Sequence, residues 1–160
     1  MKTAFINGRV AITIRYWEQR GKVTEVGARI DVRRVDQVEG PNHRPGAAGA
    51  TIAPVGGGGG IWRADLLVDL DNEVECFHYH PEFRDDDVGE RFDDPVLADD
   101  PRSWVRSQLS NIGAILETGG AADLVDSMDL AEHERHIPLM LAAVDAALER
   151  NPVVAQKASH

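Results

Sequence analysis

Two segments in the first third of the sequence alternate apolar and polar residues with a period of two. The apolar positions are Val10, Ile12, Ile14 and Tyr16 in the first segment and Val26, Ala28, Ile30 and Val32 in the second. This period is typical of strands that bury one face, so the two segments predict neighbouring antiparallel strands. A three-residue loop, Gln19-Arg20-Gly21, would place Ile14 opposite Val26. Asn7-Gly8 predicts a further hairpin before them, because type I′ turns favour this dipeptide.

A second hairpin is predicted over residues 61–80, with Asp71-Asn72 as its two-residue turn. One face of this hairpin is apolar and carries Trp62, Ala64, Leu66, Val68, Phe77 and Tyr79. The other face carries Arg63, Asp65, Leu67, Asp69, Val74, Cys76, His78 and His80. The register places Asp65 opposite His78 and Arg63 opposite His80. We therefore expect the apolar face to join the core and the polar face to carry the chemistry.

Residues 36–60 separate the two hairpins and lose the period, because they are rich in Gly and Pro. They predict a long connection with a short extended piece at Thr51–Val55. Gly56–Gly60 is typical of a flexible linker. The alternative is an anion cradle, since backbone N–H groups can converge where no Cβ intervenes. No Lys-Ser/Thr pair follows the glycines, so they are not a P-loop.

The period changes to that of helices after an acidic loop at residues 81–100. Asp100-Pro101 is a good N-cap and first helical residue, and Gly119-Gly120 would end that helix. A capping-box pattern at Asp129 predicts the start of a last helix, which Pro138 must kink or divide.

These elements fit one domain of 160 residues. We expect N-terminal hairpins over 1–35, a Gly/Pro-rich loop over 36–60, the second hairpin over 61–80, the acidic loop over 81–100 and a helical region over 101–151. The predicted fold class is α+β: an antiparallel β-meander of four or five strands, followed by two main C-terminal helices packed on one face.

The charge balance excludes several classes of partner. Lys and Arg number 17 against 27 Asp and Glu, which gives a net charge of −10. This charge opposes binding to nucleic acid and to anionic membrane surfaces. The sequence has no apolar stretch of transmembrane length, and it reaches Asn7-Gly8 before any signal-peptide-like region. We expect a cytoplasmic protein, and a homodimer, because a small sheet often completes its burial with a second copy.

The segment "ECFHYHPEF" carries the strongest chemical signal. Cys76, His78 and His80 alternate along one strand, and imidazole and thiolate suit Zn²⁺ and related transition metals. The alternative is that Asp65 holds His78 within the sheet and that Cys76 is a small buried apolar residue. The candidate polar-face site consists of Arg63, Asp65, His78 and His80. As the only cysteine, Cys76 excludes an intramolecular disulfide and a zinc site made of cysteines alone.

Two further histidines, His133 and His136, lie three residues apart in the last helix. They would add two metal ligands if that helix crossed the polar face of the hairpin. The alternative is that they are core or boundary histidines, because His133 falls within the apolar stripe of the helix. The acidic run Asp85–Asp87 does not fit an EF-hand, since Gly89 comes one position too early.

The segments "WRADL", "HYHPEF" and "FDDPVLADDP", followed by Trp104, resemble the signature of an uncharacterised family of small actinobacterial proteins. The overlap covers about residues 58–150. This resemblance implies a bacterial, actinobacterial source and no particular activity.

Two functions remain open at this stage. The first is a non-catalytic module that binds a small ligand or a protein, because the residues do not assemble a complete catalytic set. The second is a divalent-metal enzyme, hydrolytic or oxygen-handling, with zinc or a related ion on His78 and His80.

Overall fold

The computed structural model describes residues 2–37, 44–45, 51–52 and 55–150. Its main sheet consists of β1 (Lys2–Asn7), β2 (Val10–Arg20), β3 (Thr24–Gln37), β6 (Val55–Asp69) and β7 (Val74–His80). These strands follow the order β1-β2-β3-β6-β7 and are all antiparallel. A separate two-stranded sheet of β4 (Arg44–Pro45) and β5 (Thr51–Ile52) interrupts the connection between β3 and β6. The main sheet is therefore a meander with one insertion.

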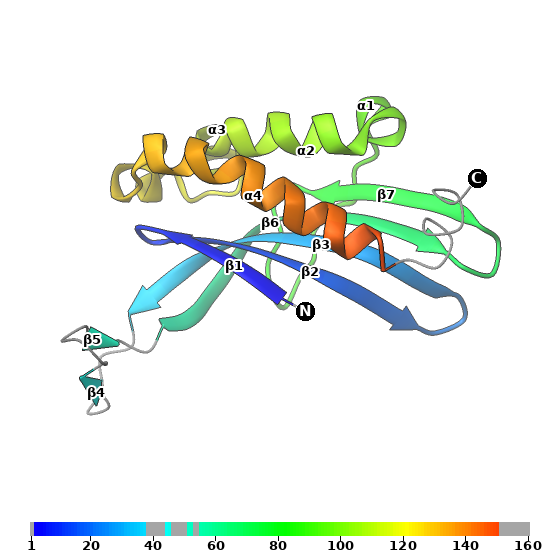
Figure 1. Ribbon diagram of the computed structural model, residues 1–160, viewed down its shortest axis with the longest axis horizontal. Coiled ribbons are helices and arrows are strands. Elements are labelled where there is room, and N and C mark those ends of the chain that lie inside the picture. Colours follow the sequence, from blue (N-terminus) through cyan, green and yellow to red (C-terminus); the bar gives the residue numbers. More distant parts are fainter. Residues whose placement is uncertain (1, 38–43, 46–50, 53–54, 151–160) are drawn as a thin grey trace.

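The helices lie over one face of this sheet (Figure 1). They are α1 (Pro95–Asp99), α2 (Pro101–Ser110), α3 (Ile112–Thr118), the 3₁₀ helix η2 (Ala122–Ser127) and α4 (Leu130–Leu148). The α+β prediction is confirmed. The predicted helix after Pro101 is interrupted at Asn111, which separates α2 from α3. None of the described helices is long and apolar enough to cross a membrane.

The helix boundaries follow the residues that predicted them. Asp100 accepts a hydrogen bond from the Ser103 amide, and Asp129 accepts one from the Glu132 amide. Each carboxylate thereby satisfies an amide that the first helical turn leaves unpaired. Pro138 does not divide α4, which runs unbroken through it.

The hydrophobic core fills the space between the sheet and the helices. Trp62 of β6 stacks on Trp104 of α2, with 6.0 Å between ring centroids. The other large buried side chains include Ile12, Ile14, Ile30 and Leu66 from the sheet and Leu109, Leu116 and Leu141 from the helices. Because this layer occupies one face only, the other face of the sheet is free to carry polar residues.

The β1–β2 and β2–β3 hairpins form, but the predicted positions of both turns were wrong. Ile14 pairs with Ile30 rather than with Val26, because β2 and β3 continue past the predicted loop and turn at residues 21–23. The shift is an even number of residues, so every side chain keeps its predicted face. The preceding turn places Gly8 and Arg9, not Asn7-Gly8, between paired residues. Gly8 has φ +57°, which suits glycine.

The glycine run was predicted as a linker and instead belongs to β6. Gly56, Gly57 and Gly60 pair with residues of β3, with register shifts beside Arg33. Gly60 has a packing reason: a Cβ there would lie 2.3 Å from the Phe83 ring. Its amide donates to Asp85, so the anion at this glycine is a carboxylate of the same chain. The rest of the predicted loop, at residues 38–43, 46–50 and 53–54, lies outside the described residues.

The hairpin formed by β6 and β7 has the predicted register. Asp65 pairs with His78 and Arg63 pairs with His80. Asp69 secures the turn, because its carboxylate accepts hydrogen bonds from the amides of Asp71 and Asn72 and from the Asn72 side chain.

Candidate functional site

The face of the sheet opposite the helices carries a buried network of charged residues. Its buried polar members are Thr13, Arg29, Asp31, Arg63, Asp65, His78 and His80, each less than 9% exposed. Cross-strand pairing arranges this polar face in two rows. One row runs Arg15, Arg29, Asp65, His78 and the other runs Thr13, Asp31, Arg63, His80. The four strands thus bring together residues that lie far apart in the sequence.

Two buried ion pairs hold the middle of the network. Arg29 Nε donates to Asp65 Oδ1 over 2.5 Å, and Arg63 Nε donates to Asp31 Oδ1 over 2.6 Å. Pairing of this kind is what permits charges to be buried. The ring of Phe83, from the loop after β7, lies 3.8 Å from the Arg63 guanidinium carbon. The loop therefore covers part of this face and shields Arg63 from water.

Both histidines of β7 present the same tautomer to the network. His78 Nδ1 lies 2.8 Å from the carbonyl oxygen of Cys76, and His80 Nδ1 lies 3.2 Å from that of Glu90. A carbonyl oxygen can only accept, so each Nδ1 must carry the proton. In the neutral ring Nε2 is then an unprotonated acceptor.

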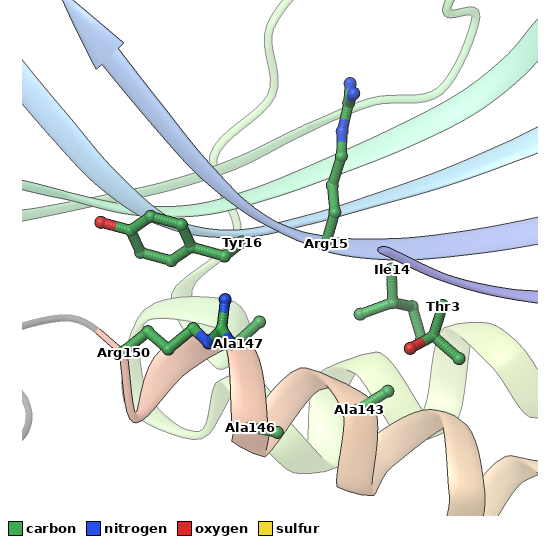
Figure 2. Close-up of a pocket in the computed structure, with 8 residues that line it drawn as sticks. All are labelled: Thr3, Ile14, Arg15, Tyr16, Ala143, Ala146, Ala147 and Arg150. Carbon is green, nitrogen blue, oxygen red and sulfur yellow. The ribbon is translucent and has the colours of Figure 1, made fainter. Parts of the chain in front are cut away.

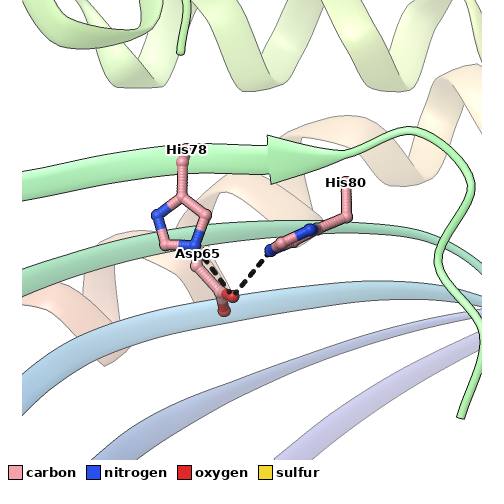
Figure 3. Close-up of side chains that lie close together, drawn as sticks. All are labelled: Asp65, His78 and His80. Carbon is pink, nitrogen blue, oxygen red and sulfur yellow. Dashed lines mark ion pairs between the residues drawn. The ribbon is translucent and has the colours of Figure 1, made fainter. Parts of the chain in front are cut away.

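These two Nε2 atoms converge on one carboxylate oxygen (Figure 3). Nε2 of His78 lies 3.6 Å from Asp65 Oδ2, and Nε2 of His80 lies 4.0 Å from the same oxygen. One ligand atom from each of the three residues lies within 4.8 Å of the other two. Two nitrogens bound to one tetrahedral zinc ion are about 3.3 Å apart, so the three atoms would move closer together to share an ion.

Burial lowers the pKa of His80. The neighbouring His78 lowers this pKa further, while Asp65 raises it. The neutral imidazole, which is the form that binds metals, is thereby favoured.

The other predicted ligands lie elsewhere. Cys76 is not part of the group, and its Sγ lies 3.7 Å from the Val74 carbonyl oxygen. His133 and His136 belong to α4, on the opposite side of the sheet. His133 is buried, with Nε2 2.8 Å from the Leu109 carbonyl oxygen, and the His136 ring lies 6.3 Å from that of Phe5. His133 is thus a core histidine and His136 a boundary histidine, as the alternative interpretation of the sequence expected.

Sequence reasoning missed the two residues of β3 that pair with Asp65 and Arg63. Arg29 and Asp31 belong to the alternating segment of β3, but only the pairing of β3 with β6 brings them to Asp65 and Arg63. The usable signal was the period of two, which places both side chains on one face. Phe83 gave no such signal, because it lies beyond the end of β7.

A pocket of about 430 Å³ opens on the helix side of β7. It is lined by Trp62, Tyr79, Pro81, Glu82, Phe92, Gln108, Asn111, Ala114, Ile115 and Thr118. Its volume falls within the range of small-molecule sites, and its walls combine aromatic rings with a few polar side chains.

Comparisons of the chain with protein-family models, with curated proteins and with solved structures gave no match.

Proposed function

We propose that this protein binds one divalent transition metal ion through His78 Nε2, His80 Nε2 and Asp65 Oδ2. Two imidazole nitrogens and one carboxylate oxygen are ligands that zinc and iron(II) accept in proteins. The ligands come from two paired strands, so their positions are fixed by the sheet rather than by a loop.

One observation carries the proposal: both Nδ1 atoms face backbone carbonyl oxygens, so in the neutral rings both Nε2 atoms face Asp65 as acceptors. Acceptor atoms that face one another repel unless a proton or a metal ion lies between them. Metal-bound histidines usually donate their second N–H to a carbonyl or carboxylate in this way. Arg29 gives Asp65 a similar support, because its Nε donates to Oδ1 and its Nη2 donates to Oδ2, the oxygen that also faces the two rings.

The ligand count points to a reactive rather than a purely structural ion. Structural zinc sites use four protein ligands, whereas catalytic zinc and iron(II) sites use three and leave positions for water or substrate. The described residues supply three. The proposal therefore includes the metal-dependent enzyme, hydrolytic or oxygen-handling, as the activity that such an ion would support.

The test is metal content and cobalt spectroscopy on protein produced without an affinity tag. We expect about one zinc, iron or manganese ion per chain after equilibration and removal of excess metal. Cobalt(II) should give visible absorption bands that report its coordination by nitrogen and oxygen. The variants His80→Gln and Asp65→Asn should lose both signals while circular dichroism shows an intact fold.

The matched control is His136→Gln, because His136 is a half-buried histidine of α4 outside the cluster. It should bind metal as the unmodified chain does. A folded, untagged protein that takes up no metal from solution would contradict the proposal, as would a His80→Gln variant with unchanged metal content.

A second candidate function, a non-catalytic module that binds a small ligand, is supported by the pocket beside β7. Tyr79 and Phe92 contribute aromatic rings 5.7 Å apart, and Gln108 and Asn111 contribute amides. Apolar walls with a few placed polar groups are typical of sites for small molecules.

A further inference from the structure

The part of the polar face that β2 contributes has features of its own. Thr13, Arg15 and Trp17 are alternate residues of β2, so they extend from the same face of the strand. Figure 2 shows Arg15 leaving the sheet on the side away from α4, whereas Tyr16 and Ile14 lie on the helix side. Strand β3 separates these three residues from Asp65, and β3 and β6 separate them from His78 and His80.

Three hydrogen-bonding atoms on these residues are buried and have no partner among the residues that the structure describes: Thr13 Oγ1, Arg15 Nε and Trp17 Nε1. Thr13 is only 6% exposed. Arg and Trp side chains donate and cannot accept, and a threonine hydroxyl can also donate. A buried donor without an acceptor costs about 1–3 kcal/mol, so three on one strand indicate that an acceptor belongs there.

Positive charge is in excess at the same place. Arg29 pairs with Asp65, Arg63 with Asp31, and Arg33 with Asp85. Arg15 only approaches Asp31, which Arg63 already engages, at 3.7 Å. Among these four arginines of the polar face, Arg15 is the one without a carboxylate of its own.

The pKa of Arg15 points in the same direction. Burial lowers this pKa, and Asp31 only partly offsets the burial, while the three neighbouring arginines lower it further. An anion beside Arg15 would relieve both the desolvation and the repulsion.

The indole of Trp17 covers this place. Its ring lies 4.5 Å from the guanidinium carbon of Arg15 and 4.0 Å from that of Arg29. Trp17 is half-buried near the free end of β2, and the Arg15 side chain is 27% exposed. The exposed part of the Arg15 side chain is therefore open to a ligand from solvent beside the indole.

From these observations we infer that the β2 end of the polar face binds an oxyanion, a carboxylate or a phosphate, through Arg15, Thr13 and Trp17. The guanidinium supplies the charge, and the hydroxyl and the indole N–H supply neutral donors. The inference does not depend on the metal site, because none of its three residues is a proposed metal ligand.

The test is titration calorimetry of the full chain with inorganic phosphate and, separately, with succinate, at constant ionic strength in chloride. Binding of phosphate alone would assign a phosphate ligand, and binding of succinate alone would assign a carboxylate; either result supports the inference. Thr13→Val keeps the shape of the side chain, Trp17→Phe keeps an aromatic ring, and each removes one donor. Each should lower the affinity for the anion at least fivefold, and Arg15→Gln should abolish binding.

Stability separates loss of binding from loss of fold. Without the anion, Thr13→Val should leave the melting temperature unchanged or raise it, because it removes an unpartnered hydroxyl. Arg20→Gln is the control, since Arg20 is an exposed arginine of the same strand whose side chain is 82% exposed. The inference is overturned if neither anion binds more tightly than chloride, or if Thr13→Val and Trp17→Phe bind the anion as the unmodified chain does. If Arg15→Gln does not fold, Thr13→Val and Trp17→Phe decide.

Discussion

Arg29 donates two hydrogen bonds to the carboxylate of Asp65, from Nε at 2.5 Å and from Nη2 at 3.3 Å. Both residues are buried, and the same carboxylate faces His78 and His80. Arg29 therefore compensates a charge that would otherwise be isolated beside two imidazole rings. This pair links the charge balance of the polar face to the proposed metal site.

The first prediction concerns the replacement of Arg29 and its effect on stabilisation by zinc. In Arg29→Gln the Asp65 carboxylate loses its cation, and breaking a buried pair in this way costs about 3–5 kcal/mol. A metal ion on Asp65 would restore a positive charge at the same place. We therefore expect zinc to raise the melting temperature of Arg29→Gln by more than it raises that of the unmodified chain, as measured by calorimetry. An equal zinc effect on both proteins would argue against metal binding at Asp65.

A second prediction concerns Gly60 and Phe83. A Cβ on Gly60 would lie 2.3 Å from the Phe83 ring, so Gly60→Ala must displace the ring and should cost about 1–3 kcal/mol in urea unfolding. Gly59→Ala is the matched control, because a Cβ there meets nothing within 4 Å. It should be neutral or stabilise by up to about 1 kcal/mol. Phe83→Ala should relieve the clash, so the double variant should lose less stability than the two single changes predict together.

The sequence alone was sufficient to predict that Asp65 and His78, which lie on one hairpin, face each other. Asp71-Asn72 predicted a turn of even length, and that parity sets Asp65 opposite His78 without knowledge of the rest of the chain. The structure keeps the parity, with the four residues 70–73 between the paired Asp69 and Val74. The side-chain face of Arg29 was equally predictable from its alternating segment. Fold class followed from the change of period between strands and helices, because each period requires a different backbone geometry.

The partners across β3 and β6 were not predictable in the same way. Their pairing spans a long connection whose composition gives no turn of defined length, so no parity argument applies to Arg29 and Asp65. The unpartnered donors of β2 were equally hidden. Whether Trp17 Nε1 has an acceptor depends on tertiary packing and not on its position in an alternating pattern.

A third prediction concerns acid stability through Asp85. Its pKa lies below the ordinary value, chiefly because Arg33 donates a hydrogen bond to the carboxylate, with a further contribution from the Gly60 amide. A carboxylate with a lowered pKa stabilises the fold above its unfolded pKa of about 4, and this contribution is lost as pH falls through the folded value. Asp85→Asn should therefore lower the melting temperature at pH 7, and this deficit should shrink as the pH falls through the lowered pKa of Asp85.

The neighbouring residue supplies the control for Asp85. Asp86→Asn makes the same change of charge on an exposed residue of the same loop and should have a small effect throughout the range. A deficit of Asp85→Asn that does not shrink on acidification would mean that the Arg33 pair adds nothing to stability.

The last prediction tests the pocket beside β7 with a neutral apolar dye, Nile red. Ala114 is an exposed residue of α3 on the wall of the pocket, so Ala114→Trp would fill the space without entering the core. The unmodified chain should enhance the fluorescence of the dye, and Ala114→Trp should weaken its binding several-fold, because the indole occupies the volume that the dye needs. Ala131→Trp makes the same substitution at an exposed position of α4 outside the pocket and should leave dye binding unchanged. If Ala114→Trp binds the dye as tightly as Ala131→Trp does, the dye does not use this pocket, and the ligand-binding function loses its structural support.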